Sequence, residues 1–343
     1  MNLNFNQRKI LVICILATLC LSTASAENSK KISEWELSAD EISLFGEPIK
    51  AFDFTKFSSE EKIKYELGKK LYFETKLSSN NLVSCNSCHN LLNGSGVDHL
   101  KTSKGVIDGK IGDRNSPTTL NAFTHVAQFW DGRASDVEAQ ALGPIMNPIE
   151  MGMPSEKAVV EKIKAIPEYV NLFKKSFSKE QDALTYQNIG NSIGFFERTL
   201  TTPSRFDDYL AGQKNALTEI EKKGAKKFIT LGCIGCHDGP NLGGNQFQKI
   251  GLIEEYDTKD LGRFNLTKEE SDKKVFKVPG LRNISRTAPY FHDGSIESLE
   301  DVITLMAKHQ LGIVWKGTQE RDELAAFLKS LDGKFVSGFE NKK

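Results

Sequence analysis

Residues 85–89 (Cys-Asn-Ser-Cys-His) and residues 233–237 (Cys-Ile-Gly-Cys-His) carry the same signature. Cys-x-x-Cys-His is the attachment site of a c-type haem: both thiols add to the vinyl groups of the porphyrin, and the adjacent His lies under the ring, where it ligates iron. A zinc half-site, a redox dithiol and a disulfide are the alternatives for a Cys-x-x-Cys pair. The long stretch between the pairs argues against one shared zinc ion, and a dithiol enzyme needs no His after its second Cys. We therefore expect two covalently bound haem c groups, held by Cys85, Cys88 and His89 and by Cys233, Cys236 and His237.

The first residues of the chain combine a short basic segment with an apolar run, residues 8–17, and then Ala-Ser-Ala at residues 24–26. This order is typical of a secretory signal peptide, and the apolar run is too short to span a membrane comfortably. We expect residues 1–26 to be removed, together with Cys14 and Cys20, so that only the four haem-type cysteines remain. The sequence thus predicts a protein of the bacterial periplasm with no membrane span after cleavage.

Chain length and net charge limit the number of domains and the kinds of binding partner that we expect. A chain of 343 residues is long enough for two domains of ordinary size. Its 45 basic residues are balanced by 45 acidic residues, which leaves no basic excess to hold nucleic acid or to anchor the chain to an anionic membrane surface.

A short pattern follows each haem motif in the same order. Arg-Asn at residues 114–115 is matched by Arg-Asn at residues 282–283, and Phe-Trp-Asp-Gly at residues 129–132 by Phe-His-Asp-Gly at residues 291–294. A helical segment comes next in both halves, from Ser135 and from Ser295. Matches that recur in one order predict an internal duplication.

The secondary-structure signals are mostly helical. Acidic residues and apolar spacing predict one helix from Ser59 to about Phe73, and another from near Thr218 to Leu231. Strand signals are weak and short. The expected fold is mostly α, with two cytochrome c-like haem domains at residues 27–210 and 211–343. Further helices are expected at residues 156–166, 186–200, 296–309 and 319–331.

The two halves differ in the residue that could serve as the second ligand of the haem iron. Met306 lies in the helix after the repeated Asp-Gly, and a thioether opposite His raises the reduction potential and closes the iron to substrate. A lone Met on a helix is otherwise core filler, and only its place in the repeat favours a ligand. The first half offers no comparable residue, but Glu150 lies among apolar residues and two prolines. Dry surroundings raise the pKa of a carboxyl toward the range of general acid–base catalysis; the alternative for Glu150 is a surface loop.

An open haem iron beside a proton-transferring Glu150, supplied by a closed haem, suits the two-electron reduction of hydrogen peroxide. Glu150 would move a proton from one peroxide oxygen to the other. Trp130, in the segment between the halves, is a candidate electron relay, or else a large core aromatic.

The chain resembles the bacterial dihaem cytochrome c peroxidase family over essentially all of its mature length. The matching segments are Cys85-x-x-Cys-His, Arg114-Asn-Ser-Pro-Thr, Gln128-Phe-Trp-Asp-Gly-Arg-Ala, residues 148–151, Cys233-x-x-Cys-His, Gly262-Arg-Phe, Pro279-Gly-Leu-Arg-Asn, Thr287-Ala-Pro-Tyr-Phe-His and Met306.

This resemblance implies a role for each site residue. His89 is the proximal ligand of a low-potential peroxidatic haem in residues 27–210, and His237 and Met306 ligate a high-potential, electron-transferring haem in residues 211–343. The other implied roles are catalytic acid/base for Glu150, distal-pocket neighbour for Gln140, inter-haem residue for Trp130, and ligands of one calcium ion for Asn115, Thr287 and Pro289, the last two through backbone carbonyls.

One position departs from the family pattern. Many members place a removable His ligand of the peroxidatic iron shortly after a Thr-Ser pair, but here residues 102–105 are followed by Val106, and no His precedes Arg114. We expect the first haem to be five-coordinate or water-bound at rest, with little need for reductive activation. A bis-His signal in the oxidised protein would instead implicate His99.

Two other classes of protein stay open. One is a dihaem electron-transfer cytochrome with both irons six-coordinate. The other is a related dihaem oxidase that modifies a partner protein, although those relatives carry Tyr where this chain has Met306. A small cytochrome c or a cupredoxin is the expected electron donor, and a homodimer the expected assembly.

Overall fold

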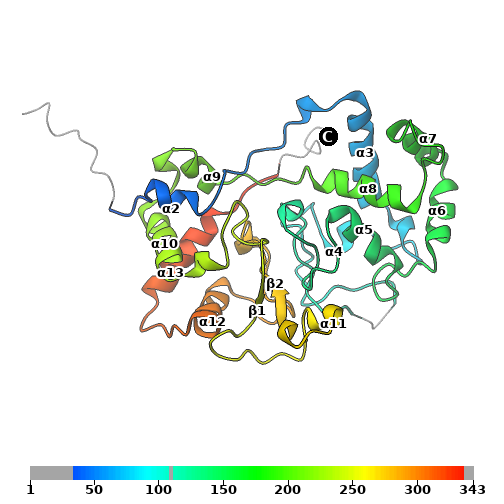
Figure 1. Cartoon of the computed structure of the whole chain (residues 1–343). Helices are drawn as coiled ribbons and strands as arrows, with labels where there is room; N and C mark the ends of the chain where they lie inside the picture. Colours follow the sequence, from blue (N-terminus) through cyan, green and yellow to red (C-terminus); the bar gives the residue numbers. More distant parts are fainter. Residues whose placement is uncertain (1–33, 108–110, 336–343) are drawn as a thin grey trace, which may run out of the picture. The chain divides into compact units, whose positions relative to one another are not determined.

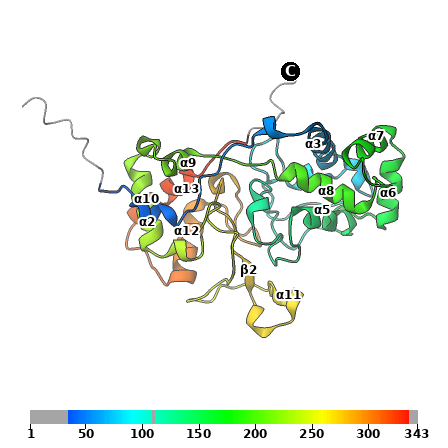
Figure 2. The same cartoon turned by 45° about the horizontal axis from the view of Figure 1, so that its top comes forward.

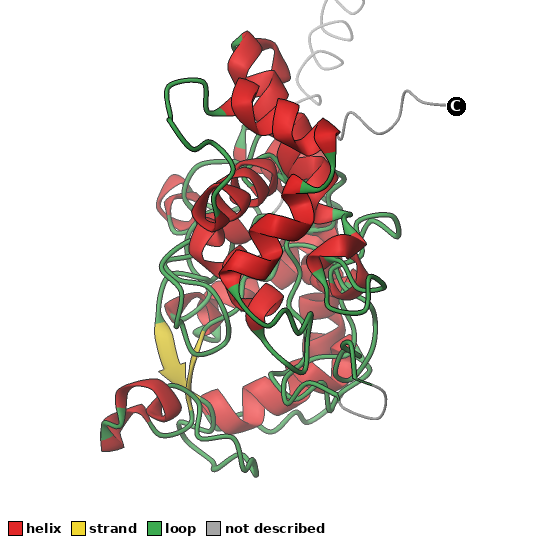
Figure 3. Ribbon diagram, turned by 90° about the vertical axis from the view of Figure 1, so that its right-hand side faces the viewer, coloured by secondary structure: helices red, strands yellow, loops and turns green. Residues whose placement is uncertain are grey.

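The computed structural model describes residues 34–107 and 111–335, so the predicted signal peptide at residues 1–26 lies outside the described residues. From Leu37 onward the chain forms one compact unit. Most of its regular structure is helical, as expected, and long irregular loops connect the helices (Figure 3). No helix within the described ranges has the length and apolar character needed to cross a membrane.

The helices are α2 (Ala39–Ser43), α3 (Ser59–Tyr72), α4 (Cys85–Cys88), α5 (Val137–Met146), α6 (Glu156–Lys164), α7 (Pro167–Ser176), α8 (Tyr186–Glu197), α9 (Arg205–Leu210), α10 (Glu219–Thr230), α11 (Phe264–Thr267), α12 (Leu299–Leu311) and α13 (Gln319–Ser330). Short 3-10 turns include η3 (Ala122–Thr124), η5 (Cys233–Gly235) and η7 (Ile284–Arg286). Strands β1 (Phe247–Lys249) and β2 (Val275–Lys277) form an antiparallel pair in which Phe247 is opposite Lys277.

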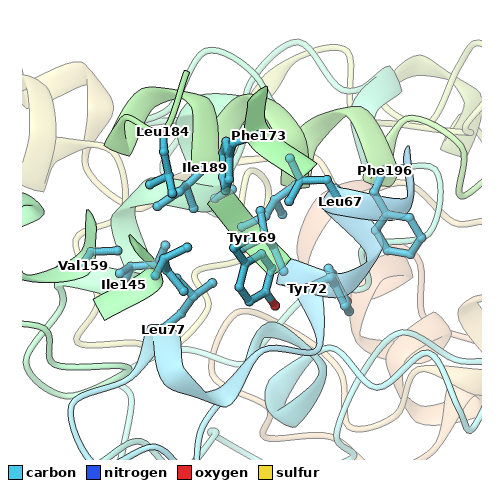
Figure 4. Packing of buried hydrophobic residues seen from close by; sticks show 14 of the residues in the cluster. Leu67, Tyr72, Leu77, Ile145, Val159, Tyr169, Phe173, Leu184, Ile189 and Phe196 are labelled. Atoms are coloured by element: carbon cyan, nitrogen blue, oxygen red, sulfur yellow. The ribbon is translucent and has the colours of Figure 1, made fainter. Parts of the chain in front are cut away.

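The first half is built on the packing of α3 against α8. A capping box starts α3: Ser58 accepts from the N–H of Glu61, whose carboxylate accepts from the N–H of Ser58. At Gly68 the two helices touch so closely that a Cβ atom would lie 1.9 Å from the carbonyl oxygen of Ser192. Figure 4 shows the core around this crossing, whose buried side chains include Leu67, Tyr72, Leu77, Ile145, Val159, Tyr169, Phe173, Leu184, Ile189 and Phe196.

The second half repeats this arrangement with α10 and α13, which lie side by side (Figure 1, Figure 2). Thr218 and Glu221 form the capping box of α10. A Cβ atom at Gly224 would lie 1.9 Å from the carbonyl oxygen of Glu323. Phe45, far away at the start of the described chain, is fully buried in this second core with Phe206, Phe228 and Phe327.

Two turns, one in each half, share unusual backbone angles. Asn121 and Asn283 have φ of 60° and 58°, and Phe129 and Phe291 have φ of 65° and 67°. Each residue of the second turn lies 162 residues after its counterpart in the first. The conformational counterpart of Asn283 is therefore Asn121, whereas the sequence comparison had paired it with Asn115.

Both asparagines reach the same threonine. Thr202, which is fully buried, accepts hydrogen bonds at Oγ1 from Asn121 Nδ2 (2.6 Å) and Asn283 Nδ2 (2.9 Å). The N–H of Thr202 donates to Asn121 Oδ1 (2.9 Å), and the N–H of Gly333 donates to Asn283 Oδ1 (2.6 Å). The two turns are thus joined through one buried hydroxyl.

The expected helices occur, with shifted ends. Helix α3 begins at Ser59 as expected and ends at Tyr72, one residue before the expected Phe73. Helix α12 begins at Leu299, three residues later than expected, because Ser298 caps it by accepting from the N–H of Asp301. Sequence analysis missed α7, although Pro167 at its first position favours a helix start, and it missed the single turn and a half of α9.

Candidate functional site

The first haem motif forms α4 itself, with His89 as its C-cap, and this histidine is oriented by the backbone. His89 Nδ1 is 2.8 Å from the carbonyl oxygen of Pro117, which leaves Nε2 available to a metal. Tyr72 fixes the same residue from the other side, since its hydroxyl donates to the carbonyl of His89 at 2.7 Å. Burial lowers the pKa of His89, so the imidazole stays neutral, as an iron ligand must be. Together with the free thiols of Cys85 and Cys88, this arrangement fits one haem.

The second haem motif opens onto a cavity of about 250 Å³. Cys233, Cys236 and His237 line it, and Met306 reaches it from α12. His237 Nδ1 is 3.1 Å from the carbonyl oxygen of Leu242, so Nε2 is again available. The other walls are mainly apolar and include Phe228, Leu231, Phe276, Ile303, Leu324 and Leu328. A mostly apolar cavity with an oriented imidazole and a thioether fits a second haem.

Glu150 is held on a tight turn that follows α5. Asn147 Nδ2 donates to Glu150 Oε1 at 2.9 Å, and the N–H of Glu150 returns to the carbonyl of Asn147 at 3.0 Å. On the other side the N–H of Val106 donates to the Glu150 carbonyl at 2.8 Å. The two segments approach so closely that a Cβ atom at Gly105 would lie 1.8 Å from the Ile149 carbonyl oxygen.

The electrostatics of this turn match the expectation for Glu150. Burial raises the pKa of its carboxyl, against the opposing charge of Arg133 and the hydrogen bond from Asn147. The carboxyl is also within electrostatic reach of the first haem motif: burial raises the pKa of the Cys88 thiol to about 11, and the charges of Asp98 and Glu150 add to that rise. Gln140 lies half-buried on α5, and among the described residues its side chain makes no hydrogen bond.

Trp130 joins the two halves. Its indole Nε1 donates to the carbonyl of Asn115 at 2.8 Å, and its own carbonyl accepts from the N–H of Lys277 at 2.7 Å. The indole and the ring of His292 are T-shaped to each other, with centroids 6.4 Å apart. Trp130 also lines the cavity of the second motif, so its position is consistent with a relay between the two haem sites.

The three predicted calcium ligands, Asn115, Thr287 and Pro289, line that same cavity. Asn115 Nδ2 donates to the carbonyls of Leu100 (3.1 Å) and Lys101 (3.4 Å), and its Oδ1 receives no hydrogen bond in the described part of the chain. There, no N–H or O–H donates to the carbonyl oxygens of Thr287 or Pro289 either. Residues 34–107 and 111–335 contain no cluster of three His, Cys, Asp or Glu suited to a metal. Uncommitted amide and carbonyl oxygens are ligands that calcium accepts, so these residues fit the ion.

His99 is already engaged and is a poor candidate for an iron ligand. Its Nδ1 is 2.9 Å from the carbonyl oxygen of Ala288, and its Nε2 is 3.2 Å from the hydroxyl of Ser95. Both ring nitrogens of His99 are therefore committed to hydrogen bonds in this structure. The N–H of Val106 is tied to the Glu150 turn.

Sequence analysis did not identify two residues that orient the site. Pro117, whose carbonyl fixes His89, belongs to the Arg-Asn-Ser-Pro run that the resemblance had singled out. Arg114 in the same run donates to Asp131 (2.8 Å) and to Asp260 (2.6 Å), which connects the two halves. The run was a signal, but its contacts depend on residues far away in the sequence.

Comparisons with known proteins agree with this geometry. Residues 62–215 match the family model described as di-haem cytochrome c peroxidase. The cytochrome c551 peroxidase of Nitrosomonas europaea is 46% identical over 272 residues, which cover 78% of this chain and 79% of the relative. The chain belongs to the di-haem cytochrome c peroxidase family.

Two further proteins are similar to this chain. The cytochrome c551 peroxidase of Pseudomonas aeruginosa is 44% identical over 275 residues, 78% of each chain. A crystal structure of a MauG-like protein associated with microbial copper homeostasis superposes with a TM-score of 0.72 at 27% identity, covering 88% of this chain and 95% of that chain. The overall fold is therefore shared with the MauG-like protein.

Proposed function

We propose that this protein is a periplasmic dihaem peroxidase that reduces hydrogen peroxide to two molecules of water with two electrons and two protons. The observation that carries the proposal is the asymmetry of the two sites: a thioether, Met306, reaches the second site, whereas a partly buried carboxyl, Glu150, lies near the first. The names of the two cytochrome c551 peroxidases support the same activity.

The chain would hold its cofactors covalently. Cys85 and Cys88 would attach one haem, with His89 as iron ligand; Cys233 and Cys236 would attach the other, with His237 and Met306 as ligands. When bound, the first haem supplies an iron site for peroxide and the second supplies electrons. One calcium ion would rest on Asn115, Thr287 and Pro289.

Glu150 would handle the proton in this reaction. As a carboxylate it takes the proton from one peroxide oxygen, and it returns that proton to the other oxygen, which leaves as water. Asn147 orients the carboxylate through Oε1, and burial raises its pKa so that it can both take and release the proton. Gln140 would face peroxide as a neighbour, and Trp130 would relay electrons between the halves.

The organisation of the chain completes the proposal. We infer two haem domains, residues 27–210 and 211–343, that arose by duplication; the matching turns at 162 residues' separation support this. Phe45 and Phe206 precede residue 211 but pack in the second core, so two segments of the first range belong to the second domain in space. Export after cleavage at residue 26, an electron donor of the small cytochrome c or cupredoxin type, and a homodimer belong to the same proposal. So does a first iron that is five-coordinate or water-bound at rest, because His99 is engaged elsewhere.

The Glu150→Gln holoenzyme tests the proposal. We expect peroxide turnover with a reduced small cytochrome c to fall by about 10²- to 10⁴-fold, the usual contribution of a general acid–base group, while both haems stay attached. Glu161→Gln, an exposed carboxyl on α6, is the matched control and should keep full turnover. Unchanged turnover in Glu150→Gln would contradict the role of Glu150, and no peroxide turnover in the wild type would favour a plain electron carrier.

A further inference from the structure

Lys277, at the end of β2, is a buried cation with an unusual partner. Its side chain is almost fully enclosed, yet within residues 34–107 and 111–335 no carboxylate pairs with its ammonium group. The ammonium nitrogen instead lies 2.8 Å from His125 Nδ1. Another buried lysine, Lys222, is paired with Glu219. Burying a positive charge without an anion beside it costs free energy, so an anion bound next to Lys277 would stabilise this part of the fold.

Around Lys277 there are more hydrogen-bond donors than acceptors. If the ammonium donates to His125 Nδ1, the proton of that imidazole is on Nε2, which faces the side-chain amide of Asn241. Asn241 Nδ2 lies 2.5 Å from this nitrogen, so the amide has to be turned over, with Oδ1 in place of Nδ2, to accept the proton. An ammonium group has three N–H donors, and the two others on Lys277 have no acceptor among the described residues.

The surrounding backbone is shaped to accommodate this cluster. A Cβ atom at Gly244 would lie 2.2 Å from the His125 ring, and one at Gly280 would lie 2.3 Å from the Asn241 amide nitrogen. Both positions therefore have to be glycine for His125 to reach across from the first half. The cluster is a built feature that joins the two halves.

Lys277 and His125 line the same cavity as His237 and Met306. Burial lowers the pKa of Lys277 to about 8, and burial and the nearby ammonium lower the pKa of His125 well below its ordinary value. A carboxylate in the cavity would offset both penalties and would accept the two remaining protons of the ammonium.

We propose that Lys277, supported by His125 and Asn241, binds a carboxylate side arm (a propionate) of the porphyrin at the second haem site. This inference rests on the proposed second haem. The buried ammonium neutralises the carboxylate beside the iron and so favours the reduced form of that haem. Since His125 comes from the first half, the contact also couples the two halves.

The test is the reduction potential of the second haem in the holoenzyme carrying Lys277→Met. Without the cation the carboxylate charge is uncompensated, and we expect the ratio of reduced to oxidised haem at a fixed potential to fall about tenfold, which is 59 mV for one electron. Lys277→Arg should keep the wild-type potential. Lys249→Met, an exposed lysine on the paired strand β1, is the matched control and should leave the potential unchanged.

A second measurement does not depend on the potential. In the infrared difference spectrum between the oxidised and reduced holoenzyme, the carboxylate band of the porphyrin should shift in Lys277→Met and, less strongly, in His125→Gln. An unchanged potential in Lys277→Met with both haems attached would overturn the inference. If Lys277→Met does not fold, an unchanged carboxylate band in His125→Gln would overturn it.

These outcomes separate this inference from the proposed function. A wild-type protein with two haems and peroxide turnover, but no effect of Lys277→Met on potential or carboxylate band, would remove only the inference. A wild-type protein that attaches no second haem would remove the proposed function with it.

Discussion

The two halves share one scaffold. In each, a helix that precedes the haem motif crosses a later helix at a glycine, Gly68 on α3 and Gly224 on α10, and a buried phenylalanine, Phe196 or Phe327, packs beside the crossing. Each also has a left-handed asparagine turn that reaches Thr202.

The halves differ where the sites need to differ. At the separation of 162 residues that relates the two turns, the position of Met306 in α12 corresponds to Pro144 in α5. Helix α12 continues to Leu311, whereas α5 ends at Met146 and the chain turns to carry Glu150. A shared scaffold thus carries the thioether that we propose as an iron ligand in one half and the carboxyl that we propose for proton transfer in the other.

Met306→Leu tests the closed side of this comparison with the largest expected effect. Leucine conserves the volume of methionine but cannot ligate iron. We expect the reduced-to-oxidised ratio of the second haem to fall about a hundredfold at a fixed potential, or about 120 mV, measured by spectroelectrochemistry. Met146→Leu in the first half is the control. A wild-type potential in Met306→Leu would mean that the thioether is not a ligand.

The two helix crossings should respond alike to added bulk. Gly68→Ala and Gly224→Ala each place a Cβ against a backbone carbonyl oxygen, so the helices must separate, and we expect each to lower the free energy of unfolding by about 1–3 kcal/mol. Urea unfolding of the holoprotein measures this. Gly317→Ala, where a Cβ would meet nothing within 4 Å, should have little effect. A clear loss in one half alone would contradict the shared scaffold.

Pro144→Met tests whether the first haem iron lacks a second protein ligand. The change places a thioether at the position that corresponds to Met306 and removes a proline that breaks the helix pattern. We expect a low-spin, methionine-ligated spectrum at the first haem and a fall in peroxide turnover of about tenfold, which is about 1.4 kcal/mol. Pro144→Leu is the matched control. Equal spectra of the two variants would show that α5 does not present this position to the iron.

Glu197, a buried carboxyl in the first half, should make the free energy of unfolding depend on pH. Burial, with the nearby charge of Glu138, raises the pKa of Glu197 to about 8. Glu197 directly follows Phe196 in the first half, whereas Leu328 directly follows the corresponding Phe327 in the second half. Between the ordinary pKa of 4.5 and 8 the folded chain holds a proton that the unfolded chain has lost. Unfolding therefore releases a proton, and the free energy of unfolding falls as pH rises, by at most about 1.4 kcal/mol per pH unit.

Glu197→Gln should remove this contribution. Urea unfolding between pH 5 and pH 7.5 would show a shallower pH dependence than in the wild type, whereas the exposed Glu161→Gln should keep the wild-type slope. Identical slopes in Glu197→Gln and wild type would show that Glu197 is ionised in the folded protein throughout this range.

Local signals predicted most of the longer helices well, and they identified both haem motifs as candidate attachment sites. The Cys-x-x-Cys-His pattern is contiguous, and capping residues such as Thr218 mark helix starts within one turn. Contacts between distant segments escaped sequence analysis. The pairing of Asn283 with Asn121 needed backbone angles, because the local Arg-Asn match pointed to Asn115. The meeting of His125 with Lys277 depends on the fold, since neither residue has a distinctive neighbour in sequence.

The buried hydroxyl of Thr202 affects the stability of fragments of this protein when the two halves are expressed separately. Asn121 is fully buried, and a fragment that ended before residue 202 would lack the partner of its amide, at a penalty of about 1–3 kcal/mol for an unsatisfied buried group. A fragment that began after it would leave the amide of Asn283 in the same position. Any single division therefore leaves Thr202 in one fragment and an unsatisfied buried asparagine in the other, so the fragment without this threonine should be the less stable of the two when expressed alone.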